Sequence, residues 1–81
     1  MPYIKGESRP ILDKIVIQVP DGLIAGELNY LITKILLGTR PRGYSNYNAL
    51  IGVLECVKLE LYRRAVAPYE DEKIEENGDV Y

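Results

Sequence analysis

The chain contains no histidine, tryptophan or phenylalanine, and Cys56 is its single cysteine. Without histidine, the usual general base near neutral pH and the commonest metal ligand are both missing. One cysteine excludes a disulfide within the chain, and an unpaired thiol is typical of a reducing cytoplasm. We therefore expect a protein that is not an enzyme and that carries no cofactor or metal.

Long apolar runs are also missing. No stretch approaches the roughly 18 apolar residues that a membrane-spanning helix requires. Residues 1–6 lack the apolar core of a secretory signal. The sequence therefore predicts no membrane partner.

What is present suits one small helical domain. The chain has 81 residues, of which 47% are hydrophobic and 27% charged. A domain of this length buries only about 60% of its unfolded surface, so its stability is marginal. We expect one domain over residues 1–81.

Charge is distributed unevenly along the chain. Residues 1–68 carry nine lysines and arginines against six acids, whereas residues 69–81 carry six acids and only Lys73. The acidic segment either meets a basic patch on the same or another chain, or is simply solvated. With a pI near 5.0 we do not expect binding of duplex nucleic acid, although a local basic patch can hold a small anion.

The N-terminal quarter predicts an arm and a helix. Pro2 and Gly6 favour an extended arm over residues 1–8. Ser8 or Arg9 then serves as N-cap, with Pro10 in the first turn of a helix. Residues 15–19 are rich in β-branched side chains, so a short strand is an alternative prediction for them. The helical spacing of the apolar positions favours helix.

A second helix is predicted over about residues 23–37, from its one-sided apolar pattern. Asp21 or Gly22 can cap its start. Gly38 suits the left-handed position that follows a helix end.

The dominant helix is predicted over about residues 46–67, with Ser45, Asn46 or Asn48 as N-cap. Further apolar side chains, including Cys56, widen its apolar surface beyond one stripe, and we expect Cys56 to be a small buried hydrophobe. A surface of this width needs more partners than two short helices supply, so we expect a homo-oligomer.

Pro68 is expected to open a short fourth helix, with acids in its first turn. Asn77 and Gly78 end it, and residues 78–81 form a tail. The predicted fold is therefore all-α, a small helical domain of three to four helices with one long helix in its C-terminal half.

The segment of residues 40–48 carries the strongest binding signal. It places two arginines, two tyrosines and small polar side chains directly before the long helix. Free N–H groups at a helix N-terminus bind anions, guanidinium groups suit phosphate, and tyrosine rings stack on bases. The alternative is a capped loop with exposed arginines and packed tyrosines.

Arg63 and Arg64 have a simpler role open to them, because they complement the C-terminal dipole of the long helix and can pair with Glu60. In an antiparallel neighbouring chain, however, they would face the segment of residues 40–48. The predicted ligand-binding residues are Arg40, Arg42, Tyr44, Asn46, Tyr47, Arg63 and Arg64.

Much of the chain resembles a known family. The segments of residues 50–64, 67–74 and 76–81, together with residues 1–4, 29–30 and 32–33, are similar to a family of short uncharacterised proteins encoded by bacteriophages, prophages and viral metagenomes. This resemblance implies viral origin and residence in the host cytoplasm. It implies no established activity.

Two functions are therefore expected. The first is a non-enzymatic phage accessory protein that binds and sequesters a small anionic, nucleotide-like ligand, by analogy with the anti-defence sponges that sequester nucleotide signals. The alternative is a protein-binding module. It would dock a host or viral protein through its tyrosine-rich surface or its acidic C-terminal segment.

Overall fold

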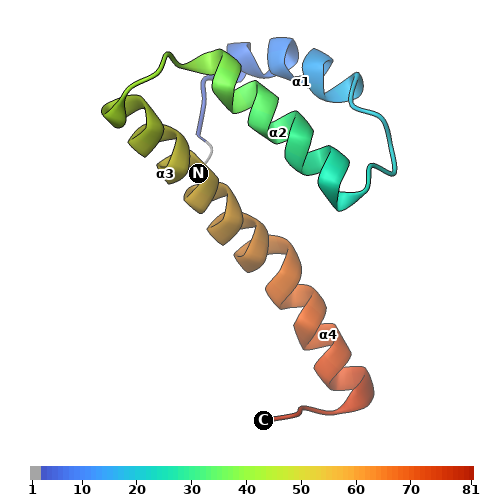
Figure 1. The fold of residues 1–81 in the computed structure, drawn as a ribbon. Coiled ribbons are helices and arrows are strands. Elements are labelled where there is room, and N and C mark those ends of the chain that lie inside the picture. The colour runs from blue at the N-terminus through green and yellow to red at the C-terminus, as the bar shows by residue number, and fades with distance from the viewer. Residues whose placement is uncertain (1–2) are drawn as a thin grey trace. The chain divides into compact units, whose positions relative to one another are not determined.

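The computed structural model describes residues 3–81, of which 77% are helical, and it contains no strand among these residues (Figure 1). This confirms the all-α prediction. The described residues form two units, residues 3–42 and residues 43–81, and each is described by itself. The single domain over residues 1–81 stays a prediction.

The expected N-terminal arm is partly wrong. Lys5 is extended, but residues Gly6–Ser8 form a 3₁₀ turn, η1, in which the Ser8 N–H donates to the Lys5 carbonyl at 3.0 Å. A turn this short needs only one such bond, so a glycine does not prevent it. Residues 1–2 of the arm lie outside the described residues.

Helix α1 spans Arg9–Ile17, with Ser8 as N-cap and Pro10 in the first turn, as predicted. Residues 15–17 are helical, so the strand alternative is wrong there. The last turn of the helix narrows to a 3₁₀ pattern, in which each N–H donates to the carbonyl three residues back. Gln18 donates to Ile15 at 3.1 Å, and Val19 donates to Val16 at 3.0 Å. Pro20 follows directly and cannot continue the helix.

Helix α2 spans Ala25–Thr39 and differs from the prediction at both ends. Its N-cap is Ile24, whose N–H donates to Oε1 of Glu27 at 3.0 Å, so Asp21 and Gly22 do not cap it. Gly38 lies inside the helix and is not left-handed. The helix ends instead at Thr39, with Arg40 as its C-cap, because Pro41 forces the residue before it into an extended conformation.

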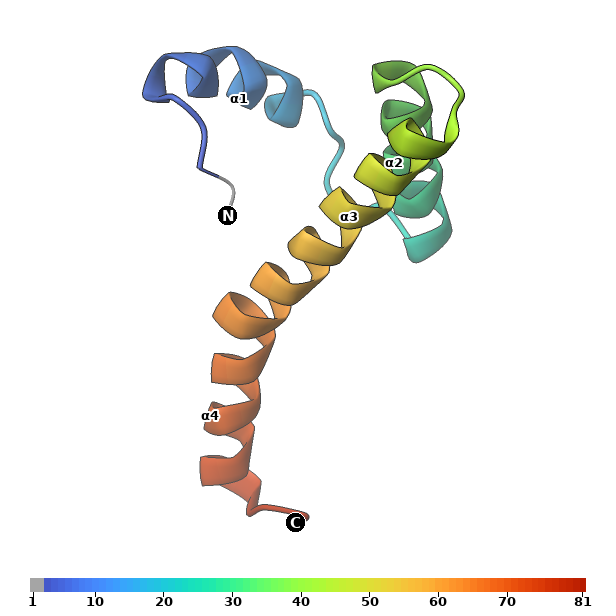
Figure 2. The same cartoon turned by 90° about the vertical axis from the view of Figure 1, so that its left-hand side faces the viewer.

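Residues 43–81 form one continuous helical rod and a tail, which can be followed in Figures 1 and 2. Helix α3 spans Tyr44–Leu61, the π-helical turn η2 spans Tyr62–Val66, and helix α4 spans Ala67–Asn77. The N-cap of α3 is Gly43, with φ 154° and ψ 153°, rather than Ser45, Asn46 or Asn48 as predicted. A residue with a side chain rarely adopts that conformation, so glycine sets the start of the helix.

Pro68 explains the π turn. It has no N–H to donate and its ring would clash with the Arg64 carbonyl in a regular α-helix. The Ala67 N–H instead donates to the Tyr62 carbonyl, five residues back, which widens the turn. The rod therefore bends between α3 and α4, as Figure 2 shows, and Pro68 lies in the first turn of α4 as predicted.

Helix α4 ends at Asn77 and Gly78, as predicted from the sequence. Gly78 has φ 86°, and its N–H donates to the Ile74 carbonyl at 2.7 Å. Residues 78–81 follow as a tail without helix.

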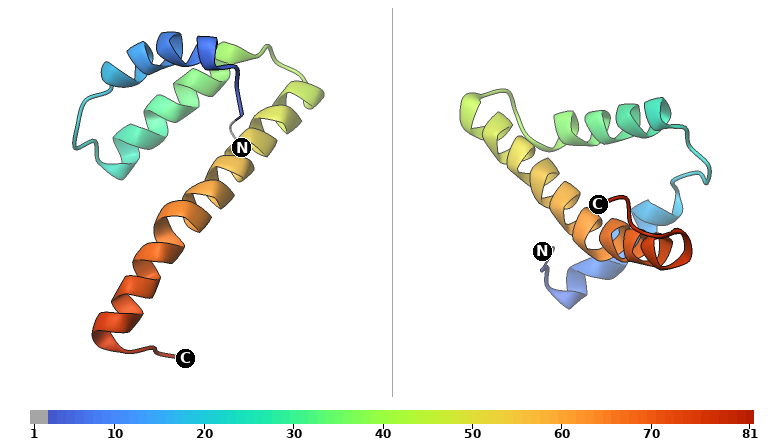
Figure 3. Two further views of the ribbon diagram at one scale, coloured as in Figure 1. Left: turned by 180° about the vertical axis from the view of Figure 1, so that it is seen from behind. Right: turned by 90° about the horizontal axis from the view of Figure 1, so that it is seen from below.

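Little of the described chain is buried. Among residues 3–81 the one buried apolar side chain is Leu50, which is 9% exposed, and Cys56 is exposed rather than buried as expected. The reason is visible in Figure 3, where residues 43–81 run as a single rod without a second layer from the same unit. A lone helix cannot cover its own apolar side chains.

Candidate functional site

The start of α3 gathers three of the predicted ligand-binding residues. Tyr44, Asn46 and Tyr47 all lie in its first turn and a half, and Tyr44 is 84% exposed. The N-cap, Gly43, has no side chain with which to cap this turn, and the Tyr47 N–H donates to the Gly43 carbonyl at 2.9 Å. Backbone N–H groups of the first turn are donors of the kind that hold an anion.

Arg40 and Arg42 belong to the other unit but precede Gly43 directly in the chain. Both side chains are exposed. The Arg40 backbone is extended, with φ −138° and ψ 141°, as Pro41 requires.

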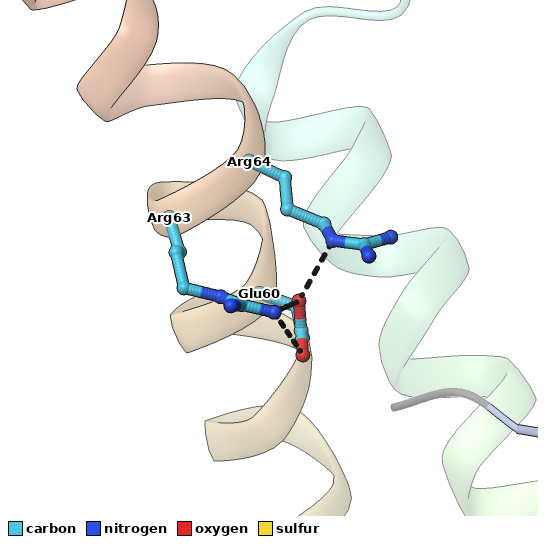
Figure 4. Close-up of polar contacts among 3 residues, drawn as sticks. All are labelled: Glu60, Arg63 and Arg64. Carbon is cyan, nitrogen blue, oxygen red and sulfur yellow. Dashed lines mark hydrogen bonds and ion pairs between the residues drawn. The ribbon is translucent and has the colours of Figure 1, made fainter.

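Arg63 and Arg64 lie in the π turn and share one carboxylate (Figure 4). Nη2 of Arg63 donates to both carboxylate oxygens of Glu60, at 3.2 and 3.1 Å, and Nε of Arg64 lies 3.4 Å from Oε2 of the same residue. The hydrogen bond from Arg63 lowers the pKa of Glu60 below its ordinary 4.5. Part of the positive charge of this pair is therefore already neutralised.

The predicted ligand-binding residues of the rod fall into two groups. Tyr47 and Arg63 are separated by about 24 Å along the helix axis at 1.5 Å per residue. One rod therefore does not bring its two groups together. As the sequence prediction assumed, a joint site requires a neighbouring chain.

A second feature was not predicted. The tail of residues 78–81 turns back beside α4 and forms a cavity of about 550 Å³, whose walls include Tyr62, Glu70, Ile74, Asp79 and Tyr81. The Tyr81 N–H donates to Oδ1 of Asp79 at 2.9 Å, which holds the tail in a turn. The sequence signals for it were Gly78, which reverses the chain, and the acids on both sides of that residue.

The charge at this cavity is mainly negative. Lys73 also lines it, but its Nζ lies 3.1 Å from Oε2 of Glu76 and 5.4 Å from the centre of the Tyr69 ring. Its charge is thus shared with groups of its own helix, which leaves Glu70 and Asp79 as the acids of the wall. An electropositive group fits this end of the rod.

Two further classes of site are absent from residues 3–81. These residues contain no group of three or more acids or cysteines placed to hold a metal ion. None of their helices has the length and apolar character needed to cross a membrane.

The fold and sites define a small all-helical protein with exposed apolar and charged surfaces. Residues 1–80 match a domain of unknown function, DUF6899, and the chain belongs to this family. No curated protein and no solved structure matches it significantly.

Proposed function

We propose that this protein acts by non-covalent binding of protein rather than by catalysis, and that its working form is a homo-oligomer. The observation that carries this proposal is the strip of Tyr47, Leu50, Leu54, Val57 and Leu61 on α3, hereafter the α3 strip. Its alternating spacing of three and four residues is that of a coiled-coil seam.

The C-terminal half of the α3 strip lies open. Leu54, Val57 and Leu61 are 36%, 57% and 60% exposed. Full burial of such a side chain contributes about 1.5–3 kcal/mol, so half-burying six of them across a dimer contributes roughly 5–9 kcal/mol. Association costs about 4–15 kcal/mol, so burial of the strip alone roughly offsets this cost. A stable dimer therefore needs further contacts.

Light scattering at protein concentrations on the order of 10 to 100 µM tests this proposal, since weak self-association is populated in that range. We expect a species of at least twice 9.2 kDa, and we expect Val57→Glu to return it to the monomer because a charge would enter the apolar contact. Asn48→Glu adds the same charge on another face of α3 and should leave the mass unchanged. A 9.2 kDa species for the parent protein across the range would overturn the proposal.

A small anionic, nucleotide-like ligand is the second candidate. It is supported by the first turn of α3, whose N-cap lacks a side chain, and by Arg42, Tyr44 and Tyr47 next to that turn in the chain. Arg63 and Arg64 of a neighbouring chain would add charge, reduced by their shared Glu60. The resemblance to short phage proteins supports viral origin and host cytoplasm, and the analogy with sponges supports a role in sequestering a defence signal.

Calorimetry with a panel of cyclic and linear nucleotides tests this second candidate. We expect micromolar binding that weakens about tenfold or more in Arg42→Ala, since a hydrogen bond to a charged group contributes about 1.5–3 kcal/mol. Arg9→Ala, on exposed α1, is the matched control. No heat from the parent protein with any nucleotide would remove this candidate.

A further inference from the structure

We infer that the surface covering the α3 strip is a second copy of this chain in antiparallel orientation, whose residues 40–42 lie against the acidic cavity at the end of α4. The inference rests on the proposed protein binding and specifies its partner. Three observations carry it: the open half of the strip, the opposite charges of the segment before the rod and of the C-terminal end of the rod, and the cavity between α4 and the tail.

The charge pattern selects the orientation. Arg40 and Arg42 immediately precede the rod, whereas α4 and the tail carry six acids and Lys73. A parallel pair would place the two acidic helices side by side, which is repulsive. An antiparallel pair places the basic segment before each rod beside the acidic end of the other rod, and the two antiparallel helix dipoles also attract each other.

The distances along the rod agree with this orientation. If the open strip is centred on Val57 in both copies, Tyr44 lies about 20 Å from the centre at 1.5 Å per residue. The residue thirteen positions in the other direction, beyond the π turn and the bend of the rod, is Glu70, which lies at a somewhat shorter axial distance and in the wall of the cavity. Arg42 is bonded directly to Gly43, the first residue of the rod, so its long side chain reaches the level of residues 70–75 of the second copy.

The cavity is chemically suited to a guanidinium group. Glu70 and Asp79 supply carboxylates, and the rings of Tyr62 and Tyr81 supply faces on which a guanidinium stacks. Its volume of about 550 Å³ accommodates at least one arginine side chain with part of its backbone. The extended backbone at Arg40 and the fixed φ of the proline that follows it limit the entropy lost when this segment docks.

Distance measurement between spin labels tests the orientation. Ser45 lies on the side of α3 away from the strip, so a label introduced through Ser45→Cys, in a Cys56→Ser background, should give about 40 Å between copies in the antiparallel pair and about 20 Å in a parallel one. A label on native Cys56 lies near the centre in both arrangements and is the control. A dimer with a short distance between labels at position 45 would overturn the inference while leaving self-association intact.

Charge reversal tests the docked segment. Arg40→Glu with Arg42→Glu should weaken the dimer about tenfold, and adding Glu70→Arg with Asp79→Arg should restore most of the loss. Lys5→Glu with Arg9→Glu makes the same change of charge elsewhere and should have little effect. Failure of the second pair to rescue the first, with the dimer otherwise intact, would remove the cavity from the interface; a monomeric parent protein would instead overturn the proposed function itself.

Discussion

The phenol of Tyr62 donates a hydrogen bond to Oε2 of Glu70, eight residues further along the chain, at 3.2 Å. The bond joins the first residue of the π turn to the first turn of α4. Both residues line the acidic cavity, so the same contact fixes the bend of the rod and one wall of the site. The charge of Glu70, and then its hydrogen bond, raise the pKa of Tyr62 above its ordinary 10.0.

The raised pKa of Tyr62 predicts a pH dependence on the alkaline side. The folded chain holds the phenol proton more tightly than the unfolded chain, so this contact stabilises the fold fully below about pH 10 and is lost as the pH rises through the raised pKa. Tyrosinate absorbance should show one late-titrating group that disappears in Tyr62→Phe. In Glu70→Gln that group should titrate earlier, and an unchanged titration in this variant would contradict the assigned cause.

Pro68→Ala should convert the π turn into regular α-helix. Alanine supplies the missing N–H for the Arg64 carbonyl and removes the ring clash, so the rod should gain up to about 3 kcal/mol of helix stability. The faces of α4 should rotate relative to α3 and break the bond between Tyr62 and Glu70. Circular dichroism and the Tyr62 titration measure the two effects. Pro10→Ala, in the first turn of α1, should change little because proline is favoured there.

The helices could be predicted from the sequence because their signals are local. Apolar periodicity located α1, α2 and the rod, and Gly78 located the end of α4. The errors lie where two local signals compete. Gly38 predicts a helix end, but α2 continues until the steric effect of Pro41 makes Arg40 extended. Ser45, Asn46 and Asn48 predict a polar N-cap for α3, but its N-cap is Gly43.

The candidate site was less predictable for a different reason. Residue types indicate chemistry, so the arginines and tyrosines of residues 40–48 could be identified as anion-binding groups. Their placement depends on packing between elements, which periodicity does not encode. The cavity at Glu70 depends on a widened turn and a reversed tail, each of which involves residues several positions apart.

The shared carboxylate of Glu60 predicts a second pH dependence, on the acid side. Its pKa is lowered because Arg63 donates to it, so the contact stabilises the rod above pH 4.5 and is lost as the pH falls through the lowered value. Helix content, measured by circular dichroism, should therefore fall in this range in the parent protein and less so in Glu60→Gln. Glu55→Gln removes a single exposed pair with Lys58, at 3.0 Å, and is the matched control. Equal acid transitions in all three proteins would show that Glu60 has no such role.

Gly43→Ala should destabilise the protein through its backbone alone. With φ 154° and ψ 153°, Gly43 adopts a conformation in which a side chain costs about 1–3 kcal/mol. Space is not the reason, since the nearest atom to an added Cβ is Nδ2 of Asn46 at 3.8 Å, an ordinary contact distance.

The matched control for Gly43→Ala is Gly38→Ala. This residue lies inside α2 with nothing within 4 Å of an added Cβ, so alanine should stabilise the chain by about 0.5–1 kcal/mol. Urea unfolding followed by circular dichroism, at one protein concentration because association contributes to stability, measures both changes. Opposite signs for the two substitutions are expected. Stabilisation by Gly43→Ala would mean that α3 starts from a cap other than Gly43, and the first turn proposed to hold an anion would lose its structural basis.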